Sequence, residues 1–243
     1  MFGRAKRRTC GAVIVAAGSG TRMQLAPRRD GTSVNKVFLE LDGVPILGHT
    51  LLAFESCRSV DGIVLVTRAC DIPLCKPLAD ELGITKLKSI ISGGATRQES
   101  VRAGLAALGE EYDLAAIHDA ARCLIRPEDI EAVVAEADAF GAATLGAPCS
   151  DSLKRVDASG TIVEEVDRTD VYRVQTPQVF VREQIIAAHE KAWEAGVTAT
   201  DDCGVAQRAG IRVRMVDAGA YNIKITTQED LALAEAFLAG GGC

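Results

Sequence analysis

Short apolar runs rich in β-branched residues alternate along this chain with stretches of helical periodicity, and this alternation limits the possible folds. The apolar runs predict strands at 12–16, 62–67, 88–91, 114–118, 142–148 and 211–216. Apolar residues at three- and four-residue spacing predict helices at 45–56, 96–108, 127–140, 182–195 and 228–238. Such alternation is typical of an α/β fold with a mainly parallel, twisted sheet covered by helices. Ligands of these sheets bind beyond the carboxyl ends of the strands.

The composition is that of a globular protein. The chain has 243 residues, 48% of them hydrophobic, so we expect a single domain over 1–243 with a sizeable core. No apolar run reaches the roughly 20 residues of a membrane span, and the basic start lacks the apolar segment of a secretory signal. A net charge of −6 argues against a nucleic-acid partner. We therefore expect a cytoplasmic protein that binds neither membranes nor nucleic acid.

The first predicted strand runs directly into a glycine turn, Ala16-Ala17-Gly18-Ser19-Gly20-Thr21-Arg22. The glycines let the backbone approach a ligand, and the N–H groups of a tight turn converge on an anion. Arg22 adds a permanent charge. The turn lacks the lysine of a Walker A loop, and Met23 stands where a dinucleotide fingerprint has its third glycine. This pattern favours a phosphate site of another kind, with an ordinary strand-to-loop turn as the alternative.

Further polar residues follow the later strands. Lys36 ends a polar loop, 24–35, that is suited to closing over phosphates. Gly94 leads into a helix and, with the hydroxyl of Ser100, offers groups that can seat a base or a sugar. Asp119 follows a buried strand, where a carboxylate can help to place a divalent cation between phosphates. These residues point to one polar site at the carboxyl edge of the sheet.

Two more cations are candidates for the same polyanion. Lys224 lies in a short strand-like run before the last helix, and Arg168 lies beside a turn. In an acidic chain, cations that lie beside turns rather than on helix faces suggest an anionic ligand, although a solvated lysine is the simpler alternative for Lys224.

The segment 150–174 has no helical periodicity. It shows short alternation on both sides of a turn at 157–160, which predicts a β-hairpin that leaves the main body. A polar hairpin alone buries too little surface to be stable, so we expect it to pack on a second subunit. A surface excursion on a monomer is the alternative.

In this order, the motifs resemble the 2-C-methyl-D-erythritol 4-phosphate cytidylyltransferases of the non-mevalonate isoprenoid pathway. The resemblance covers nearly the whole chain. Its matching segments are 16–23, 35–36, 93–101, 118–122, 151–155, 167–168, 175–178, 200–202 and 222–226. It implies a Rossmann-like nucleotidyltransferase domain with a β-arm that interlocks two subunits, CTP as the donor and Mg²⁺ as the cofactor.

The resemblance also implies roles for individual residues. Backbone groups of Ala16, Ala17, Gly18, Ser19 and Gly20 would hold the triphosphate, and Gly94, Ser100, Asp119 and Ala120 would hold cytosine and ribose. The catalytic cations would be Arg22, Lys36 and Lys224. The acceptor, methylerythritol phosphate, would contact Ser152, Arg168, Thr176 and Thr200, with Arg168 delivered from the partner's arm. Mg²⁺ would be held mostly by the CTP phosphates, with Asp119 as its protein ligand.

The chain departs from the family pattern in two places: 22–36 is longer than in many relatives, and Cys123 replaces a proline. One alternative is a CTP-dependent cytidylyltransferase for another polyol phosphate, such as ribitol 5-phosphate. Another is a catalytically inactive nucleotide-binding regulator, against which the intact set of cations argues. A fusion to the later cyclase of the pathway is not expected, because little sequence follows the last predicted helix.

Overall fold

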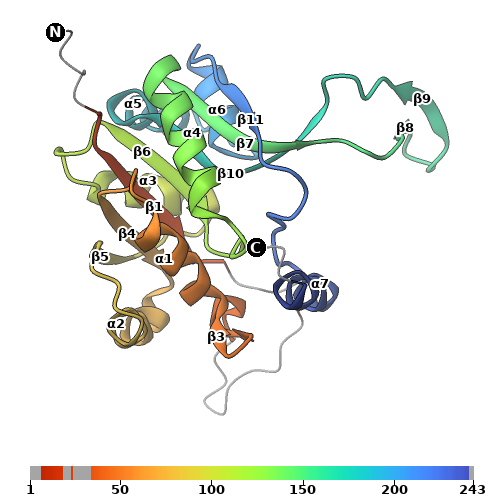
Figure 1. The fold of residues 1–243 in the computed structure, drawn as a ribbon. Coiled ribbons are helices and arrows are strands. Elements are labelled where there is room, and N and C mark those ends of the chain that lie inside the picture. The colour runs from red at the N-terminus through yellow and green to blue at the C-terminus, as the bar shows by residue number, and fades with distance from the viewer. Residues whose placement is uncertain (1–6, 19–22, 24–33, 241–243) are drawn as a thin grey trace, which may run out of the picture.

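The computed structural model describes residues 7–18, 23 and 34–240, and its centre is a seven-stranded sheet. The strands lie in the order β11, β7, β10, β6, β1, β4 and β5 (Figure 1). Their bounds are β1 Cys10–Val15, β4 Gly62–Thr67, β5 Leu87–Ser92, β6 Leu114–Asp119, β7 Ala142–Pro148, β10 Tyr172–Val181 and β11 Arg214–Asp217. Within the described sheet, β10 alone runs antiparallel to its neighbours. The predicted mainly parallel α/β fold is confirmed.

Helices cover both faces of this sheet. One face carries α1 Ile46–Ser56 and α4 Pro127–Phe140, and the other carries α3 Arg97–Ala107, α5 Arg182–Glu194 and α6 Asp202–Arg208. Side chains alternate along a strand, so Ile14 of β1 packs in the first core while its neighbour Val13 packs in the second. The apolar runs therefore become strands that are buried on both faces.

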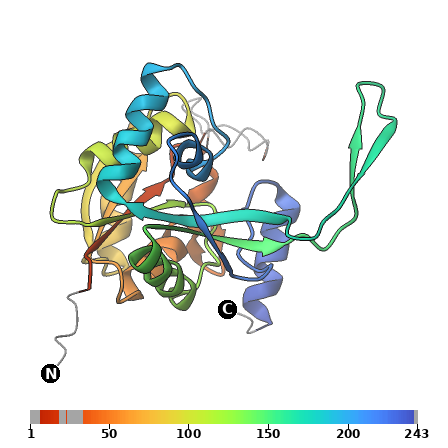
Figure 2. The ribbon, with the colours of Figure 1, turned by 90° about the horizontal axis from the view of Figure 1, so that it is seen from above.

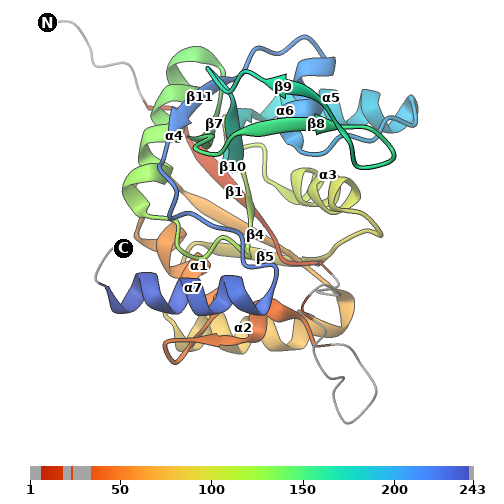
Figure 3. The same cartoon turned by 90° about the vertical axis from the view of Figure 1, so that its right-hand side faces the viewer.

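Smaller elements complete the molecule. They are the 3₁₀ turns η2 Lys36–Phe38 and η3 Ala69–Asp71, the hairpin of β2 Glu40–Leu41 with β3 Val44–Pro45, and the helices α2 Ile72–Glu81 and α7 Gln228–Ala239. Helix α7 packs beside the β2–β3 hairpin (Figure 3). Across the described ranges, no helix combines the length and the apolar character that crossing a bilayer requires.

Gly104 sets how closely α3 approaches the sheet. A Cβ atom at this position would lie 2.3 Å from Cγ1 of Val13 and 2.8 Å from Cγ2 of Val66, so a larger residue would push the helix away. The close approach brings the first turn of α3, with Arg97, to the carboxyl ends of β1 and β6. The packing thus positions a polar helix terminus at the edge of the sheet where ligands bind.

Among the strands of the large sheet and the α-helices, three were not predicted. Strand β10 contains Pro177, which removes a ladder donor, and the sheet accommodates it with a register shift between Val174 and Gln178. Helix α2 has Pro77 in its interior, a residue that usually ends a helix. Helix α6 has only seven residues, too few for a periodic pattern to be recognised.

The segment 150–174 contains the predicted β-arm. Strands β8 Leu153–Val156 and β9 Ile162–Val166 form an antiparallel hairpin that extends away from the main body, as Figure 2 shows clearly. Its turn is held by the carboxylate of Asp157, which accepts the backbone N–H groups of Ser159 and Thr161 at 2.9 and 3.0 Å. The apolar side chains of Val156, Ile162 and Val163 are 55%, 62% and 57% exposed. The protruding arm is confirmed, and it carries apolar side chains that the described residues leave exposed.

Candidate active site

A cavity of about 340 Å³ opens at the carboxyl ends of β1 and β6. Strands β4 and β5 follow β1 on one side of the sheet while β6 lies on the other, so the direction of strand order reverses between β1 and β6. This is the place where open α/β sheets bind ligands. The cavity is lined by Val15, Ala16, Ala17, Gly18, Asn35, Lys36, Val37, Gly94, Ala95, Thr96, Arg97, Ser100, Asp119, Ala121, Lys224 and Thr226.

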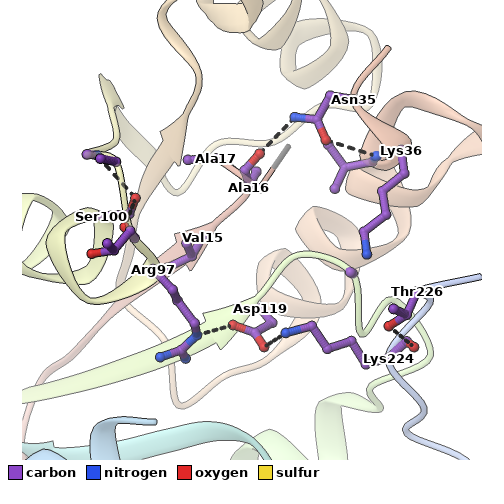
Figure 4. Close-up of a pocket in the computed structure, with 16 residues that line it drawn as sticks. Val15, Ala16, Ala17, Asn35, Lys36, Arg97, Ser100, Asp119, Lys224 and Thr226 are labelled. Atoms are coloured by element: carbon purple, nitrogen blue, oxygen red, sulfur yellow. Dashed lines mark hydrogen bonds and ion pairs between the residues drawn. The ribbon is translucent and has the colours of Figure 1, made fainter. Parts of the chain in front are cut away.

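Asp119 is the centre of the charged part of this cavity. Its Oδ1 atom accepts from Nε of Arg97 at 2.8 Å, and its Oδ2 atom accepts from Nζ of Lys224 at 2.7 Å. Figure 4 shows the two cations on opposite sides of the carboxylate. Burial by itself raises the pKa of a carboxyl group, but the charges of Arg97 and Lys224 outweigh it and hold the pKa of Asp119 below its ordinary value. Asp119 is therefore an anion shared by two cations.

A buried histidine supports Asp119 from behind. The hydroxyl oxygen of Thr176 accepts the backbone N–H of Asp119 at 3.1 Å and lies 3.0 Å from Nδ1 of His118. Nε2 of His118 lies 3.2 Å from the carbonyl oxygen of Arg122. Burial lowers the pKa of His118 to about 3, so its ring is neutral at neutral pH. This geometry gives His118 a structural role.

Lys36 enters the cavity from a loop that is fixed to the end of β1. Its Nζ atom donates to the carbonyl oxygen of Ile225 at 2.6 Å. The preceding residue, Asn35, donates from Nδ2 to the carbonyl oxygen of Ala16 at 2.8 Å and to Oδ2 of Asp71 at 3.0 Å. Arg68 binds the same Asp71 through two N–H groups at 2.6 and 3.0 Å. This network places the ammonium group of Lys36 where it can reach a ligand bound beyond the carboxyl end of β1.

The segment with Lys224 is fixed just as firmly. Nη1 of Arg122 donates to the carbonyl oxygen of Asn222 at 2.8 Å, and the backbone N–H of Ile225 donates to the carbonyl oxygen of Ala121 at 2.8 Å. The amide of Asn222 in turn donates to Gln175 and Thr176, both at 3.0 Å. These bonds tie the segment to the ends of β6 and β10, so that the position of Lys224 is set by tertiary structure.

On the far side of the cavity, the glycine pair before α3 makes room for the end of β1. A Cβ atom at Gly93 would lie 2.6 Å from Cβ of Ala17 and 2.6 Å from Oγ of Ser100. The hydroxyl of Ser100 accepts the N–H of Gly94 at 3.2 Å and donates to the carbonyl oxygen of Thr96 at 2.9 Å. This wall combines the glycine pair and the Ser100 hydroxyl with Arg97 from the first turn of α3, whereas Lys36 and Lys224 line the opposite wall (Figure 4).

Most of the residues predicted for the donor meet in this cavity. The lining contains Ala16, Ala17, Gly18, Lys36, Gly94, Ser100, Asp119 and Lys224. Ala120 lies just behind it, since its N–H donates to Val15 and its carbonyl accepts the hydroxyl of Thr50. Ser19, Gly20 and Arg22 lie outside the described residues.

The residues predicted for the acceptor are dispersed. Ser152 and Arg168 are exposed beside the arm, where Arg168 donates to the carbonyl oxygen of Ser150. Thr200 is exposed just before α6. Thr176 is buried behind Asp119 with its hydroxyl already bonded. The described part of the chain therefore brings most of the predicted donor residues together but not the predicted acceptor residues.

Two residues without a predicted role contribute strongly. Asn35 fixes the loop of Lys36, and Arg97 binds Asp119. Both belong to the motifs on which the family resemblance rests. The position of Arg97 in the first turn of a helix after a glycine pair was the available signal, because helix N-termini after strands point into the crevice.

The described residues include no group of three or more His, Cys, Asp or Glu side chains that could hold a metal ion. Among the residues that line the described part of the cavity, Asp119 is the single carboxylate.

Comparisons with known proteins agree with this geometry. The family model of 2-C-methyl-D-erythritol 4-phosphate cytidylyltransferase (IspD) matches residues 10–240. The enzyme of that name from Desulforamulus reducens is 41% identical over 233 residues, which cover 96% of this chain and 97% of the relative. The crystal structure of 4-diphosphocytidyl-2C-methyl-D-erythritol synthase from Anaerococcus prevotii superposes with a TM-score of 0.84 at 27% identity, covering 96% of each chain. That of 2-C-methyl-D-erythritol 4-phosphate cytidylyltransferase from Thermus thermophilus gives a TM-score of 0.75 at 30% identity, covering 93% of this chain and 98% of the other. The chain belongs to the 2-C-methyl-D-erythritol 4-phosphate cytidylyltransferase family.

Proposed function

We propose that the cavity between β1 and β6 binds CTP and that its cations catalyse transfer of the cytidylyl group to 2-C-methyl-D-erythritol 4-phosphate. The family has this activity, and the observation that carries the proposal is the arrangement of Lys36, Arg97 and Lys224 around one buried carboxylate at the strand ends. The products are 4-diphosphocytidyl-2-C-methyl-D-erythritol and pyrophosphate. The whole chain would act as one nucleotidyltransferase domain.

The two walls of the cavity suit the two ends of the nucleotide. The triphosphate would lie along the backbone of Ala16 to Gly18, which lines the cavity, close to Lys36 and Lys224. The base and ribose would lie against the polar groups of Gly94 and Ser100, beside Arg97. Because Ser100 already orders the glycine turn, a base would meet groups that are fixed before it binds.

The reaction joins two anions, so charge is the main obstacle. An oxygen of the acceptor's phosphate monoester attacks the α-phosphorus of CTP in line. The bond from that phosphorus to the bridging oxygen breaks, and its electron pair leaves with pyrophosphate. Fixed ammonium groups of Lys36 and Lys224 would stabilise the charge that builds on the α-phosphoryl oxygens. No covalent enzyme intermediate is required.

A divalent cation fits this site as a partner of the nucleotide. Mg²⁺ prefers oxygen ligands and is often bound through one or two carboxylates together with substrate phosphates, and Asp119 offers such a carboxylate. When bound, Mg²⁺ would neutralise phosphate charge. Asp119 is held ionised by Arg97 and Lys224, so it can accept a cation without first losing a proton.

The acceptor site would be completed by a second subunit. The arm extends away from its own cavity and carries exposed Val156, Ile162 and Val163, which a dimer would cover. A two-fold dimer would deliver Arg168 of one subunit to the cavity of the other, where it would bind the acceptor's phosphate. Ser152 and Thr200 would add hydroxyl groups, and Thr176 would act from behind Asp119.

Pyrophosphate release tests the proposal directly. The pure protein is incubated with Mg²⁺ and CTP, with methylerythritol 4-phosphate in one tube and ribitol 5-phosphate in another. Release with the first acceptor alone is expected. Release with the ribitol compound alone would keep the mechanism and overturn the acceptor, whereas CTP binding without release in either tube would favour a regulator.

A further inference from the structure

Asp202 is a second buried carboxylate that contacts Arg97. Nη2 of Arg97 lies 2.9 Å from Oδ2 of Asp202, while Nε of the same side chain donates to Asp119 at 2.8 Å. Only 1% of the Asp202 side chain is exposed. One edge of the guanidinium is therefore divided between two carboxylates that come from β6 and α6.

Asp202 is held in place by three elements. Nε2 of His189, on α5, lies 3.1 Å from Oδ1 of Asp202. Gln178 of β10 accepts the N–H of Cys203 at 2.9 Å and donates to Asp201 at 2.9 Å, which fixes the first turn of α6. Asp201 also caps this helix by accepting the N–H of Gly204 at 2.8 Å. The carboxylate that faces Arg97 thus has little freedom to move.

The histidine has a defined role in this arrangement. His189 is 1% exposed, and its Nδ1 atom has no hydrogen-bond partner among the described residues. A proton on Nδ1 would be buried without an acceptor, so the tautomer that fits carries its proton on Nε2 and donates to Asp202. Asp202 therefore accepts a hydrogen bond from His189 with Oδ1, while its Oδ2 forms an ion pair with Arg97.

Because Nε and Nη2 of Arg97 contact different carboxylates, the hydrogen bond between Asp119 and Lys224 is protected. Arginine often binds one carboxylate through two parallel N–H bonds. If Asp202 did not hold Nη2, the Nε and Nη2 edge would be free to take both oxygens of Asp119. Oδ2 is the oxygen that now accepts from Lys224 at 2.7 Å. If Arg97 bound both oxygens of Asp119, it would compete with Lys224 for Oδ2.

We propose that Asp202, oriented by His189, is a positioning residue that keeps Arg97 on a single oxygen of Asp119 and leaves the other oxygen to Lys224. The effect on catalysis rests on the proposed function of the cavity, whereas the effect on the geometry does not. Asp202 is not among the residues that line the cavity, and it acts on the site through Arg97, which is.

The test replaces Asp202 by asparagine, which is nearly isosteric. In D202N the amide oxygen still accepts from His189, but the amide N–H groups face the guanidinium, donor against donor. We expect kcat to fall roughly tenfold to a hundredfold, as for other small misplacements near a reacting centre. The KM for CTP is expected to change less, because the contact with Lys224 matters most in the transition state. D202E, which restores the charge, is expected to recover part of the loss.

Two controls separate positioning from stability. E190Q alters a carboxylate on the same helix as His189 that binds Arg102 at 2.7 Å outside the cavity, and it is expected to leave kcat unchanged. The second control introduces D202N into the R97M enzyme. There D202N should cause no further loss of kcat, because Arg97, through which Asp202 acts, is already absent. An equal loss in both backgrounds, or a D202N enzyme that behaves like E190Q, would overturn the proposal.

A crystal structure of D202N gives a readout that does not depend on activity. Both N–H groups of the Arg97 edge are expected on Asp119. An Arg97 that keeps its single contact would overturn the proposal whatever the turnover. Inactivity of the parent enzyme with CTP would count against the proposed function alone.

Discussion

Lys224 and Asp119 are 105 residues apart in the chain, yet Nζ of the lysine and Oδ2 of the aspartate are separated by 2.7 Å. The pair joins the segment before α7 to the end of β6, and it keeps a cation at the cavity in a form that is neutralised until an anionic ligand arrives. With Arg97 on the other oxygen, Asp119 balances two cations at once. In the proposed function, the charge of Asp119 would therefore control how strongly the cavity attracts phosphates.

Replacing Asp119 by asparagine is expected to separate binding from catalysis. D119N leaves Arg97 and Lys224 without their shared anion, so the cavity gains one positive charge. Metal-free CTP should then bind at least as tightly as to the parent, because its phosphates meet a more positive site. Turnover with Mg²⁺ should fall by about a hundredfold or more. Calorimetry in EDTA and a pyrophosphate assay check the two parts, and weaker metal-free binding would contradict this account.

Lys36→Ala is expected to keep the fold and lose turnover. The ammonium of Lys36 bonds the carbonyl oxygen of Ile225 and faces the cavity, where its proposed role is to stabilise charge in the transition state. Removing one preorganised donor of this kind costs about 3 kcal/mol, roughly a hundredfold or more in kcat. Lys76→Ala, which breaks an exposed pair with Asp80 on α2, is the matched control and should be neutral. Near-normal kcat in the first variant would remove Lys36 from the mechanism.

Because His118 is buried, we expect the free energy of unfolding to decrease at acidic pH. Its pKa is about 3 in the folded protein because of burial, while a histidine in the unfolded chain titrates near about 6.5. Between these values the unfolded state binds the extra proton, so the free energy of unfolding falls as the pH falls, by up to about 1.4 kcal/mol per unit. Urea unfolding between about pH 7 and 4 measures the slope. In His118→Gln this slope should flatten, and an unchanged slope would assign it to other groups.

Gly104→Ala tests how closely α3 must approach the sheet. The added methyl group would lie 2.3 Å from a γ-carbon of Val13, a β-branched side chain with little freedom in a strand. We expect unfolding free energy to fall by about 1–3 kcal/mol, more than alanine gains as a helix former. Ala106→Ser, on the exposed side of the same helix, should have a small effect. Equal stabilities of the two variants would show that the helix shifts without penalty.

Much of this fold could be predicted from local patterns. Strands at 62–67 and 142–148 and the helix at 127–140 have the predicted bounds, because their residues are apolar runs or carry a clear helical period between a proline start and a glycine end. Strand β10 was missed because Pro177 contradicts local strand preference, and the sheet accepts it only through a register shift that neighbouring strands impose.

The parts of the site that lie directly after a strand could be predicted, whereas the contacts between segments far apart in the sequence could not. The turn at Ala16 to Gly18 and the carboxylate of Asp119 are read directly from strand ends. The contacts that link Lys224 to Asp119, Asp119 to Arg97 and Arg97 to Asp202 join four separate segments of the sequence. No local pattern indicates that these segments meet. Such contacts are set by the order of strands in the sheet, which the alternation of strands and helices does not determine by itself.

Arg168→Ala is expected to raise the KM for methylerythritol phosphate and to leave CTP binding as it is. In the proposed dimer this guanidinium reaches the partner's cavity, so its loss removes a contact with the acceptor alone. A selective loss of CTP affinity would contradict the assignment. Dimer formation is checked by the solution mass at micromolar concentration, where a monomer is incompatible with an arm that completes the neighbouring site.

Mixing two damaged subunits gives a sharper test of the arm. Lys36→Ala damages a subunit's own cavity, whereas Arg168→Ala damages the cavity of its partner. In a heterodimer of the two, one cavity therefore carries both lesions and the other carries neither. A random co-refolded mixture should regain about a quarter of parental activity, since half of its two-fold dimers are mixed and each has one intact site. If both residues served the same subunit's cavity, no combination would be intact and the mixture would stay as inactive as its components.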